Sequence, residues 1–339
     1  MKKMMQNKKN QFAIIKGIIF LLIFSNFIHP AQKKNPIDYS DFISGKRILF
    51  LGDSITQDGR YVSFIEYYLN SNFPDSNIDL ISIGLSSETV SGLTEPGHPY
   101  LRPCLFERLD SAIFKIKPGI IVACYGMNDG IYHPQSEERF KKYKEGIKKL
   151  IHKADSAKAK LILITPPMFD TVSAKFKPVG DDSKEYGYSK PSHRYNQVLG
   201  DYAEWLMSLK MKNVLVIDLH SAMTDYAITR QNETPDFSFS KDGIHPQDEG
   251  HLFMAQTFLA GIGIKINRNK LSEELKKIKA DSLFILIDQY RRTRSKGWLS
   301  YIGFKLEKAV KTNEILSTEE KCKLLHEHIV RYLKNLKKG

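Results

Sequence analysis

The chain has 339 residues, 42% of them hydrophobic, and a net charge of +13. This length and composition are those of an ordinary globular protein with a full core. The positive charge lies at the ends: residues 1–31 hold five lysines and no acidic residue, and residues 265–339 hold 19 basic and 9 acidic residues, which leaves about −2 for residues 32–264. This central segment has no charge bias toward polyanions, so no nucleic-acid partner is expected.

Residues 1–31 combine a basic start with an apolar run at 12–28. This pattern is typical of a signal peptide. The apolar stretch at 17–27 is short for a membrane span, which needs about 20 residues. The alternative is an uncleaved N-terminal anchor, because Lys16 interrupts the run and a poor cleavage site follows it. In both cases we expect an exported protein, periplasmic or extracellular, that contacts a membrane only through this segment if it is uncleaved.

Short apolar runs followed by turn residues and helix-like stretches recur along the middle of the chain. They lie at 47–53, 78–84, 119–126, 160–167 and 214–219. Such runs are typical of buried parallel strands, and their alternation with helices predicts an α/β fold with a doubly wound sheet and helices on both faces. Ligands of such folds bind beyond the carboxyl ends of the strands. The loops after the strands are therefore where site residues are expected.

Helical spacing of apolar residues predicts helices between these strands and after them. The expected helices lie at 61–73, 105–116, 138–156, 193–210, 271–292 and 317–338. An aromatic insert at 295–304 either covers a cleft or packs the tail onto the domain. The loop at 168–192 is long and polar, which is more typical of a lid or a binding loop than of a domain break.

Three residues with functional potential follow the first three strands. Ser54 stands in LGDSIT, Gly84 in ISIG and Asn128 in YGMNDG. Each has a plain structural explanation: a helix N-cap for the serine, a turn for the glycine and a turn for the asparagine. Together they are the parts of an oxyanion site, in which N–H donors stabilise the tetrahedral intermediate of acyl transfer.

The stretch DGIHP after the fifth strand supplies a base. His245 can take the proton of Ser54, and Asp242 can orient the imidazole. A metal site is the main chemical alternative, because residues 248–251 add two carboxylates and a second histidine. His245 and His251 are six positions apart and would lie on different faces of a helix. We therefore expect catalysis without a metal or another cofactor.

The blocks GDS at 52–54, glycine at 84, GMND at 126–129 and DGIH at 242–245 occur in this order. With them the sequence resembles the SGNH (GDSL-type) hydrolase family of esterases and lipases. The resemblance implies a three-layer αβα sandwich with a five-stranded parallel sheet in the order 2-1-3-4-5. It also implies a catalytic triad of Ser54, Asp242 and His245, and an oxyanion hole made by the Ser54 and Gly84 backbone N–H groups and the Asn128 side chain.

The sequence departs from the family pattern at two positions. The first block continues with Ile55 where the family name has leucine, and the second block has Ser82 where many members carry asparagine. Neither change touches a proposed donor or the nucleophile.

We expect three segments: residues 1–31 as signal peptide or anchor, 32–264 as an SGNH hydrolase domain, and 265–339 as a basic helical C-terminal extension. The expected function is a serine esterase that hydrolyses a small-molecule or glycan ester. The acyl group is expected to be short, with acetyl as the main candidate, because the strand-tip loops are polar rather than continuously apolar. A lysophospholipase or thioesterase is the alternative. A non-catalytic carbohydrate-binding protein on the same fold is a further one.

The roles of three loop residues and the pairing of the three cysteines are not decided by the sequence. His98, Arg102 and His133 in the tip loops are candidates for substrate binding, and each has loop stabilisation as its alternative. Cys104, Cys124 and Cys322 give no disulfide framework, although a bridge between the first two is compatible with the sequence.

Overall fold

The computed structural model describes residues 35–268, 270–304 and 315–337. Residues Asn35–Gly339 form one compact unit. The predicted signal peptide or anchor at 1–31 lies outside the described residues. Within the described ranges no helix is both long and apolar enough to cross a membrane.

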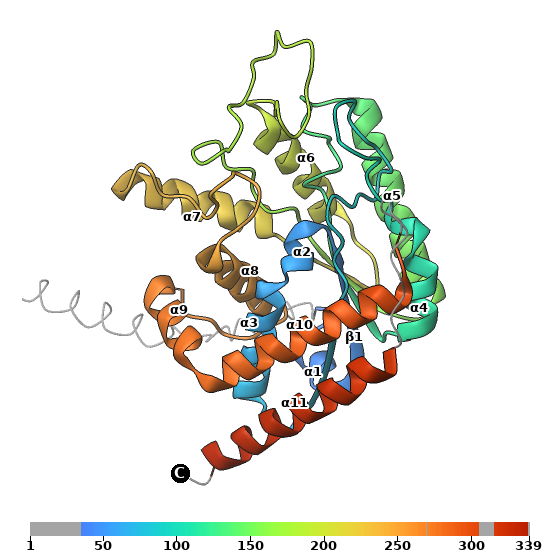
Figure 1. Cartoon of the computed structure of the whole chain (residues 1–339). Coiled ribbons are helices and arrows are strands. Elements are labelled where there is room, and N and C mark those ends of the chain that lie inside the picture. The colour runs from blue at the N-terminus through green and yellow to red at the C-terminus, as the bar shows by residue number, and fades with distance from the viewer. Residues whose placement is uncertain (1–34, 269, 305–314, 338–339) are drawn as a thin grey trace, which may run out of the picture. The chain divides into compact units, whose positions relative to one another are not determined.

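A five-stranded sheet lies at the centre of this unit (Figure 1). Its strands are β1 Ser44–Gly52, β2 Asn77–Ser82, β3 Ile120–Cys124, β4 Lys160–Ile164 and β5 Val214–Ile217. All neighbours pair in parallel, in the order β2-β1-β3-β4-β5, which confirms the predicted fold class and strand order. The order reverses between β1 and β3, so the crevice beyond the carboxyl ends of these two strands is the expected ligand position.

Helices and one 3₁₀ turn connect and flank the strands. They are α1 Tyr39–Phe42, α2 Ser54–Asp58, α3 Arg60–Asn72, η1 Leu105–Glu107, α4 Leu109–Ile116, α5 Glu137–Ser156, α6 Tyr195–Ser208, α7 Leu219–Glu233, α8 Asp248–Gly261, α9 Leu271–Ala280, α10 Ser282–Ile302 and α11 Ile315–Leu336. The predicted helices between the strands are confirmed, with the region 105–116 divided into η1 and α4.

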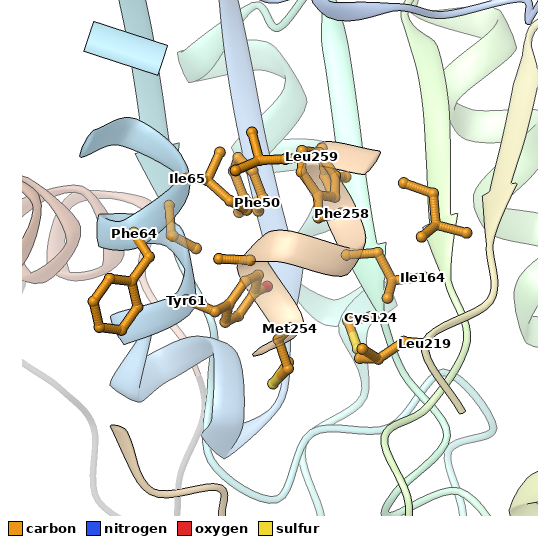
Figure 2. Packing of buried hydrophobic residues seen from close by; sticks show 14 of the residues in the cluster. Phe50, Tyr61, Phe64, Ile65, Cys124, Ile164, Leu219, Met254, Phe258 and Leu259 are labelled. Atoms are coloured by element: carbon orange, nitrogen blue, oxygen red, sulfur yellow. The ribbon is translucent and has the colours of Figure 1, made fainter. Parts of the chain in front are cut away.

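The two faces of the sheet carry separate apolar layers because side chains alternate along each strand. In β1, Phe50 points to the face covered by α3 and α8, where its ring lies near Tyr61 and Phe258 (Figure 2). Its neighbours Leu49 and Leu51 point to the other face and join the cluster of α4, α5 and α6. Both faces of the sheet are thus buried, as the nearly continuous apolar strands predicted.

The C-terminal extension differs in detail from the expected helices. The stretch 271–292 is two helices, because Asp281 ends α9 and caps α10 by accepting the backbone N–H of Leu283 at 2.8 Å. The aromatic insert is helical up to Ile302, with Trp298 buried in the layer of α4, α5 and α6. The insert therefore packs the tail onto the domain, which is the second of the two alternatives given for it.

Helix α10 covers the open edge of β2. Arg294 donates from Nη1 to the backbone oxygen of Leu80 at 3.0 Å and pairs with Asp79 at 2.6 Å. An edge strand otherwise presents unpaired carbonyl groups, and a covered edge cannot recruit another chain. Trp298 then ties α10 to α11 through a 2.6 Å hydrogen bond to Glu319. The extension is therefore packed against the sheet that carries the candidate site.

The three cysteines are free in the structure. Cys124 lies buried at the end of β3, where burial raises the pKa of its thiol. Cys104 is partly exposed and forms no bridge with it.

Candidate active site

The end of β1 positions Ser54 at the rim of the sheet. Gly52 is the last residue of the strand, and a Cβ there would lie 2.2 Å from the Thr56 hydroxyl oxygen, so only glycine fits. Asp53 is buried and caps α2 by accepting the Ile55 N–H at 3.0 Å. Ser54 is the first residue of α2 rather than its cap, which leaves its hydroxyl available for another contact.

The loop before α8 holds Asp242 and His245 in a tight turn. One carboxylate oxygen of Asp242 accepts the backbone N–H groups of Ile244 and His245 at 2.9 and 2.8 Å. Gly243, which follows Asp242, has a φ of +83°, and a Cβ there would lie 2.7 Å from the backbone oxygen of Asp170. The local sequence thus fixes the carboxylate next to the histidine ring. Asp248 and Glu249 lie in the first turn of α8.

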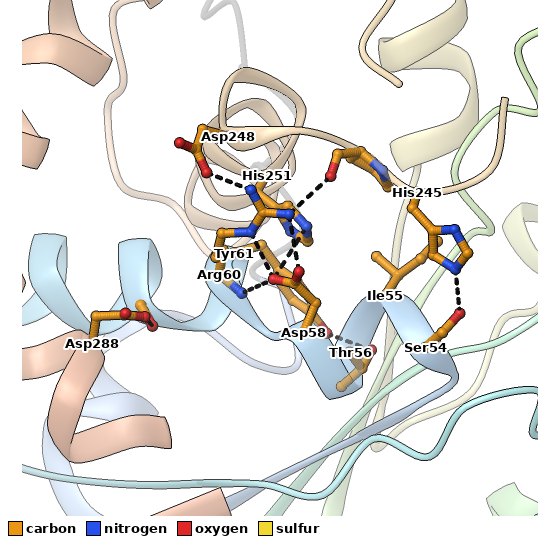
Figure 3. A network of polar contacts seen from close by, with 12 residues as sticks. Ser54, Ile55, Thr56, Asp58, Arg60, Tyr61, His245, Asp248, His251 and Asp288 are labelled. Carbon is orange, nitrogen blue, oxygen red and sulfur yellow. Dashed lines mark hydrogen bonds and ion pairs between the residues drawn. The ribbon is translucent and has the colours of Figure 1, made fainter. Parts of the chain in front are cut away.

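Tertiary packing brings Ser54 and His245 together across 191 positions of sequence. The Ser54 Oγ lies 2.8 Å from His245 Nε2, and His245 Nδ1 lies 2.7 Å from the second carboxylate oxygen of Asp242 (Figure 3 shows the serine–histidine contact). With the Nδ1 proton donated to the carboxylate, Nε2 holds a lone pair that accepts the serine O–H. The arrangement can accept a proton from the serine and stabilise the imidazolium that results.

The charges of this chain of hydrogen bonds reinforce one another. Burial opposes ionisation of Asp242, but the hydrogen bonds from His245 and Ile244 outweigh it and hold the pKa of the carboxyl well below its usual range. The hydrogen bond to Asp242 raises the pKa of His245 above its ordinary value, against the opposing effect of burial. Burial also raises the pKa of the neighbouring Asp53 carboxyl to about 7.

Gly84 and Asn128 lie beyond the carboxyl ends of β2 and β3, on either side of β1. A Cβ on Gly84 would lie 2.2 Å from the backbone nitrogen of Gln57, so the glycine lets its loop approach α2 closely. The Asn128 amide is buried, and the Tyr132 hydroxyl donates to its oxygen at 3.2 Å. Its Nδ2 donates to the Glu88 backbone oxygen at 3.3 Å. This group has a second N–H, which a ligand can use.

Arg60 joins the end of α2 to the loop that carries His245 (Figure 3). Its Nε and Nη2 donate to the two carboxylate oxygens of Asp58 at 2.7 and 2.9 Å. The same guanidinium pairs with Asp248 in α8 and donates to the backbone oxygen of Pro246 at 3.3 Å. One side chain therefore binds both segments that meet at the serine–histidine contact.

Comparison with known proteins places this fold and its motifs. Residues 50–252 match the model of the GDSL-like lipase/acylhydrolase family, which is more than half of the chain. The chain belongs to this family. It is accordingly a hydrolase that acts on ester bonds, and the resemblance to SGNH hydrolases is confirmed.

Individual relatives are distant. The chain is 23% identical over 242 residues to an acetylxylan esterase of Geobacillus stearothermophilus, which covers 67% of this chain and 98% of the relative. Among solved structures, BT4096, a gut microbial diltiazem-metabolizing enzyme, has a TM-score of 0.50 and 25% identity over 65% of this chain. The match covers 47% of that enzyme, so the chain spans about half of its length. Axe2, an acetylxylan esterase from Geobacillus stearothermophilus, has a TM-score of 0.46 and 23% identity, over 66% of this chain and 97% of its own.

Arg102, one of the candidate substrate-binding residues of this GDSL-like hydrolase, is buried. Its Nε and Nη2 each lie 2.7 Å from a carboxylate oxygen of Glu95, and its backbone N–H binds Thr94. These contacts correspond to the loop-stabilising alternative. Substrate binding by Arg102 stays a prediction.

The two histidines of that group are partly exposed. His98 binds the Tyr100 backbone oxygen through Nδ1 at 2.6 Å, and its ring contacts the ring of Tyr188. His133 binds the Ile131 backbone oxygen through Nδ1 at 2.8 Å. Burial lowers the pKa of both imidazoles, which favours their neutral form. Their roles in binding stay predictions.

The residues behind the metal alternative are separated in the structure. His251 is buried 3.5 Å from Asp58 and stacks on Tyr61, and Asp248 is held by Arg60 and Lys279. In the part of the chain that the structure describes, no group of three or more His, Cys, Asp or Glu side chains is arranged to hold a metal ion.

A cavity beside the tip loops contains residues that the motifs did not single out. Its volume is about 320 Å³, and His133, Glu95, Tyr186 and Tyr188 line it. The tyrosines belong to the 168–192 loop, where the sequence signal for them is the pair of aromatic residues in EYGYSK.

Proposed function

We propose that this GDSL-like hydrolase is a serine esterase that uses Ser54, His245 and Asp242 in a two-step acyl transfer. Ser54 attacks the ester carbonyl while His245 takes the serine proton and then gives it to the leaving alcohol. Water, activated by the same imidazole, hydrolyses the acyl-enzyme. The observation that carries the proposal is the chain of hydrogen bonds at 2.8 Å and 2.7 Å through His245.

The proposed oxyanion hole consists of the Ser54 and Gly84 backbone N–H groups and the Asn128 amide. Its support is the position of the three residues beyond the ends of neighbouring strands, with the Asn128 amide oriented by Tyr132. Removing one such donor typically costs about 3 to 4 kcal/mol of transition-state stabilisation.

The proposed substrate is a carbohydrate that carries short acyl groups, with acetyl as the main candidate. Two observations support it: a relative covered over nearly its whole length is an acetylxylan esterase, and polar groups and tyrosines line the cavity beside the tip loops. A binding wall for a long acyl chain would instead be continuously apolar.

The test is acetate release from acetylated xylan and from other acetylated polysaccharides, beside aryl esters of increasing acyl length. We expect activity on acetyl esters that falls with chain length. Ser54→Ala should lower kcat at least about 1,000-fold, whereas Ser208→Ala, at the exposed end of α6, should match the wild type.

Two outcomes would contradict the proposal. Hydrolysis that survives in Ser54→Ala would exclude the serine mechanism. A preference for acyl chains longer than about eight carbons would replace the carbohydrate substrate by a lipid or thioester of the lysophospholipase or thioesterase class.

We also propose that the enzyme acts after export, on the basis of the basic start and apolar run at 1–31. N-terminal sequencing of the chain recovered from the producing cells separates a cleaved signal peptide from an uncleaved anchor. An uncleaved chain in the soluble cytoplasmic fraction would contradict both.

A further inference from the structure

We infer that the cavity lined by His133, Tyr186 and Tyr188 is a subsite for a neutral sugar unit of the glycan that carries the ester. The inference rests on the proposed carbohydrate esterase function and specifies where the leaving-group side of the substrate binds. The volume of about 320 Å³ is at the lower end of the range for small-molecule sites.

The cavity lies on the same edge of the sheet as Ser54. Its walls come from the loops after β2, β3 and β4, and all of these follow carboxyl ends of parallel strands. Glu95 and Gly97 belong to the first loop, His133 to the second and Tyr186 to the third. The 168–192 loop rises at the same end of the unit as α2 (Figure 1).

The 168–192 loop contacts both the proposed catalytic residues and the cavity. Near its start, the backbone N–H of Asp170 binds the Gly243 oxygen at 2.9 Å, and that of Lys175 binds the Asp242 oxygen at 3.1 Å. Near its end, Ser192 N–H binds the backbone oxygen of Tyr132 at 2.9 Å. Tyr132 binds the Asn128 amide, so the loop is attached to both sides of the proposed site.

The rings that line the cavity are held in place before any ligand binds. The Tyr186 hydroxyl donates to the Gly180 backbone oxygen at 2.9 Å, and its ring lies 5.4 Å from that of His133. Gly187 and Lys190 exchange two backbone hydrogen bonds, which closes a tight turn around Tyr188. A preformed wall loses little conformational entropy when it binds a ligand.

The chemistry of the wall fits a sugar better than a cation. Tyrosine rings offer apolar faces to the C–H side of a pyranose, and their edges are polar. His133 gives its Nδ1 proton to Ile131, so its Nε2 lone pair can accept a hydrogen bond from a sugar hydroxyl. Both carboxylates that line the cavity are in ion pairs, Glu95 with Arg102 and Glu185 with Lys190, which disfavours a cationic ligand.

The experiment measures binding separately from hydrolysis. The full chain carrying Ser54→Ala is titrated calorimetrically with unacetylated xylotetraose, and the titration is repeated with Tyr186→Ala added. We expect the second substitution to weaken binding about 10-fold, and Tyr186→Phe, which keeps the ring, to weaken it less. Tyr39→Ala, in the helix that precedes the amino-terminal end of β1, is the control and should bind like the parent.

Kinetics on the Ser54-containing enzyme give the second readout. Tyr186→Ala should lose more kcat/KM on acetylated xylo-oligosaccharide than on an aryl acetate, mainly through KM. Equal Kd values with and without Tyr186→Ala, or no xylotetraose binding in either protein, would overturn the subsite. Serine-dependent aryl acetate hydrolysis without any acetyl-glycan hydrolysis would instead remove the proposed substrate, whatever the calorimetry shows.

Discussion

The guanidinium of Arg60 donates to the backbone oxygen of Pro246 at 3.3 Å, next to the histidine that contacts Ser54. Through Asp58 the same group is bound to the last residue of α2, the helix that starts with Ser54. The distance between the serine hydroxyl and the imidazole therefore depends on a side chain that contacts neither. A displacement of about 1 Å in such a pair can lower the rate about 100-fold.

Arg60→Ala should lower kcat on an aryl acetate about 10-fold, with a smaller change in KM. The reason is that the His245 loop loses its attachment to α2 while the substrate-facing groups remain. Arg60→Lys, which keeps the charge and can still reach Asp58, should recover part of the loss. If Arg60→Ala lowers the melting temperature but leaves kcat of the folded enzyme unchanged, Arg60 is a structural residue alone.

Asp242→Asn should lower kcat about 100-fold or more and shift the acidic limb of the pH–rate profile downward. Asp242 raises the pKa of His245, and only the neutral imidazole can accept the serine proton. In the wild type, activity should therefore fall as pH drops through a His245 pKa above its ordinary value of about 6.5. Asp236→Asn, at an exposed position, is the control. An acidic limb that stays in place in Asp242→Asn would contradict this assignment.

Gly84→Ala should nearly abolish hydrolysis and lower the free energy of unfolding by about 1–3 kcal/mol. The added methyl group would lie 2.2 Å from the Gln57 nitrogen and 2.3 Å from the Thr56 carbonyl carbon, so α2 must move. Gly200→Ala in α6 has its nearest contact at 3.4 Å, and the alanine favours the helix, so this control should be neutral or stabilising by up to about 1 kcal/mol. Denaturant unfolding and aryl acetate kinetics measure both effects. Full activity in Gly84→Ala would show that the close approach to α2 is dispensable.

Arg294→Met should lower the free energy of unfolding by about 1–3 kcal/mol, because it leaves the Leu80 oxygen of β2 without its side-chain donor and Asp79 with Arg47 as its remaining partner. Arg292→Met removes an exposed arginine from the same helix and should change stability by less than about 0.5 kcal/mol. Urea unfolding of the full chain compares the two. Equal stability of both variants would show that α10 does not depend on Arg294 to cover the sheet edge.

Sequence patterns were sufficient for the architecture and for the candidate triad. The five apolar runs predicted the strands because a strand buried on both faces has no polar positions, as in β3, where all five residues are buried. Ser54, Gly84 and Asn128 were identifiable because each depends on local geometry at a strand end, and the DGIH block was identifiable because a tight turn before α8 places Asp242 next to His245. The geometry at a strand end restricts the residue types allowed there, as Gly52 and Gly84 show.

Sequence patterns did not predict the contacts between segments that are distant in the chain. Nothing near Arg102 in the sequence indicates that its guanidinium is used by Glu95, and nothing in EYGYSK indicates that Tyr186 lies against His133. The attachment of the His245 loop to α2 by Arg60 spans 186 positions. Such pairs depend on how the helices and loops pack, because a hydrogen bond or ion pair acts only over a few ångströms.

The sequence by itself determined the strand pattern, the family motifs and the identity of the residues at the strand ends, since periodicity and backbone geometry are local properties. Only the tertiary structure decided that Ser54 and His245 meet at 2.8 Å, that α10 covers the edge of β2, and that three tip loops enclose one cavity. These relationships arise when segments far apart in the chain bury their apolar faces against the same sheet, which brings their polar groups within bonding distance.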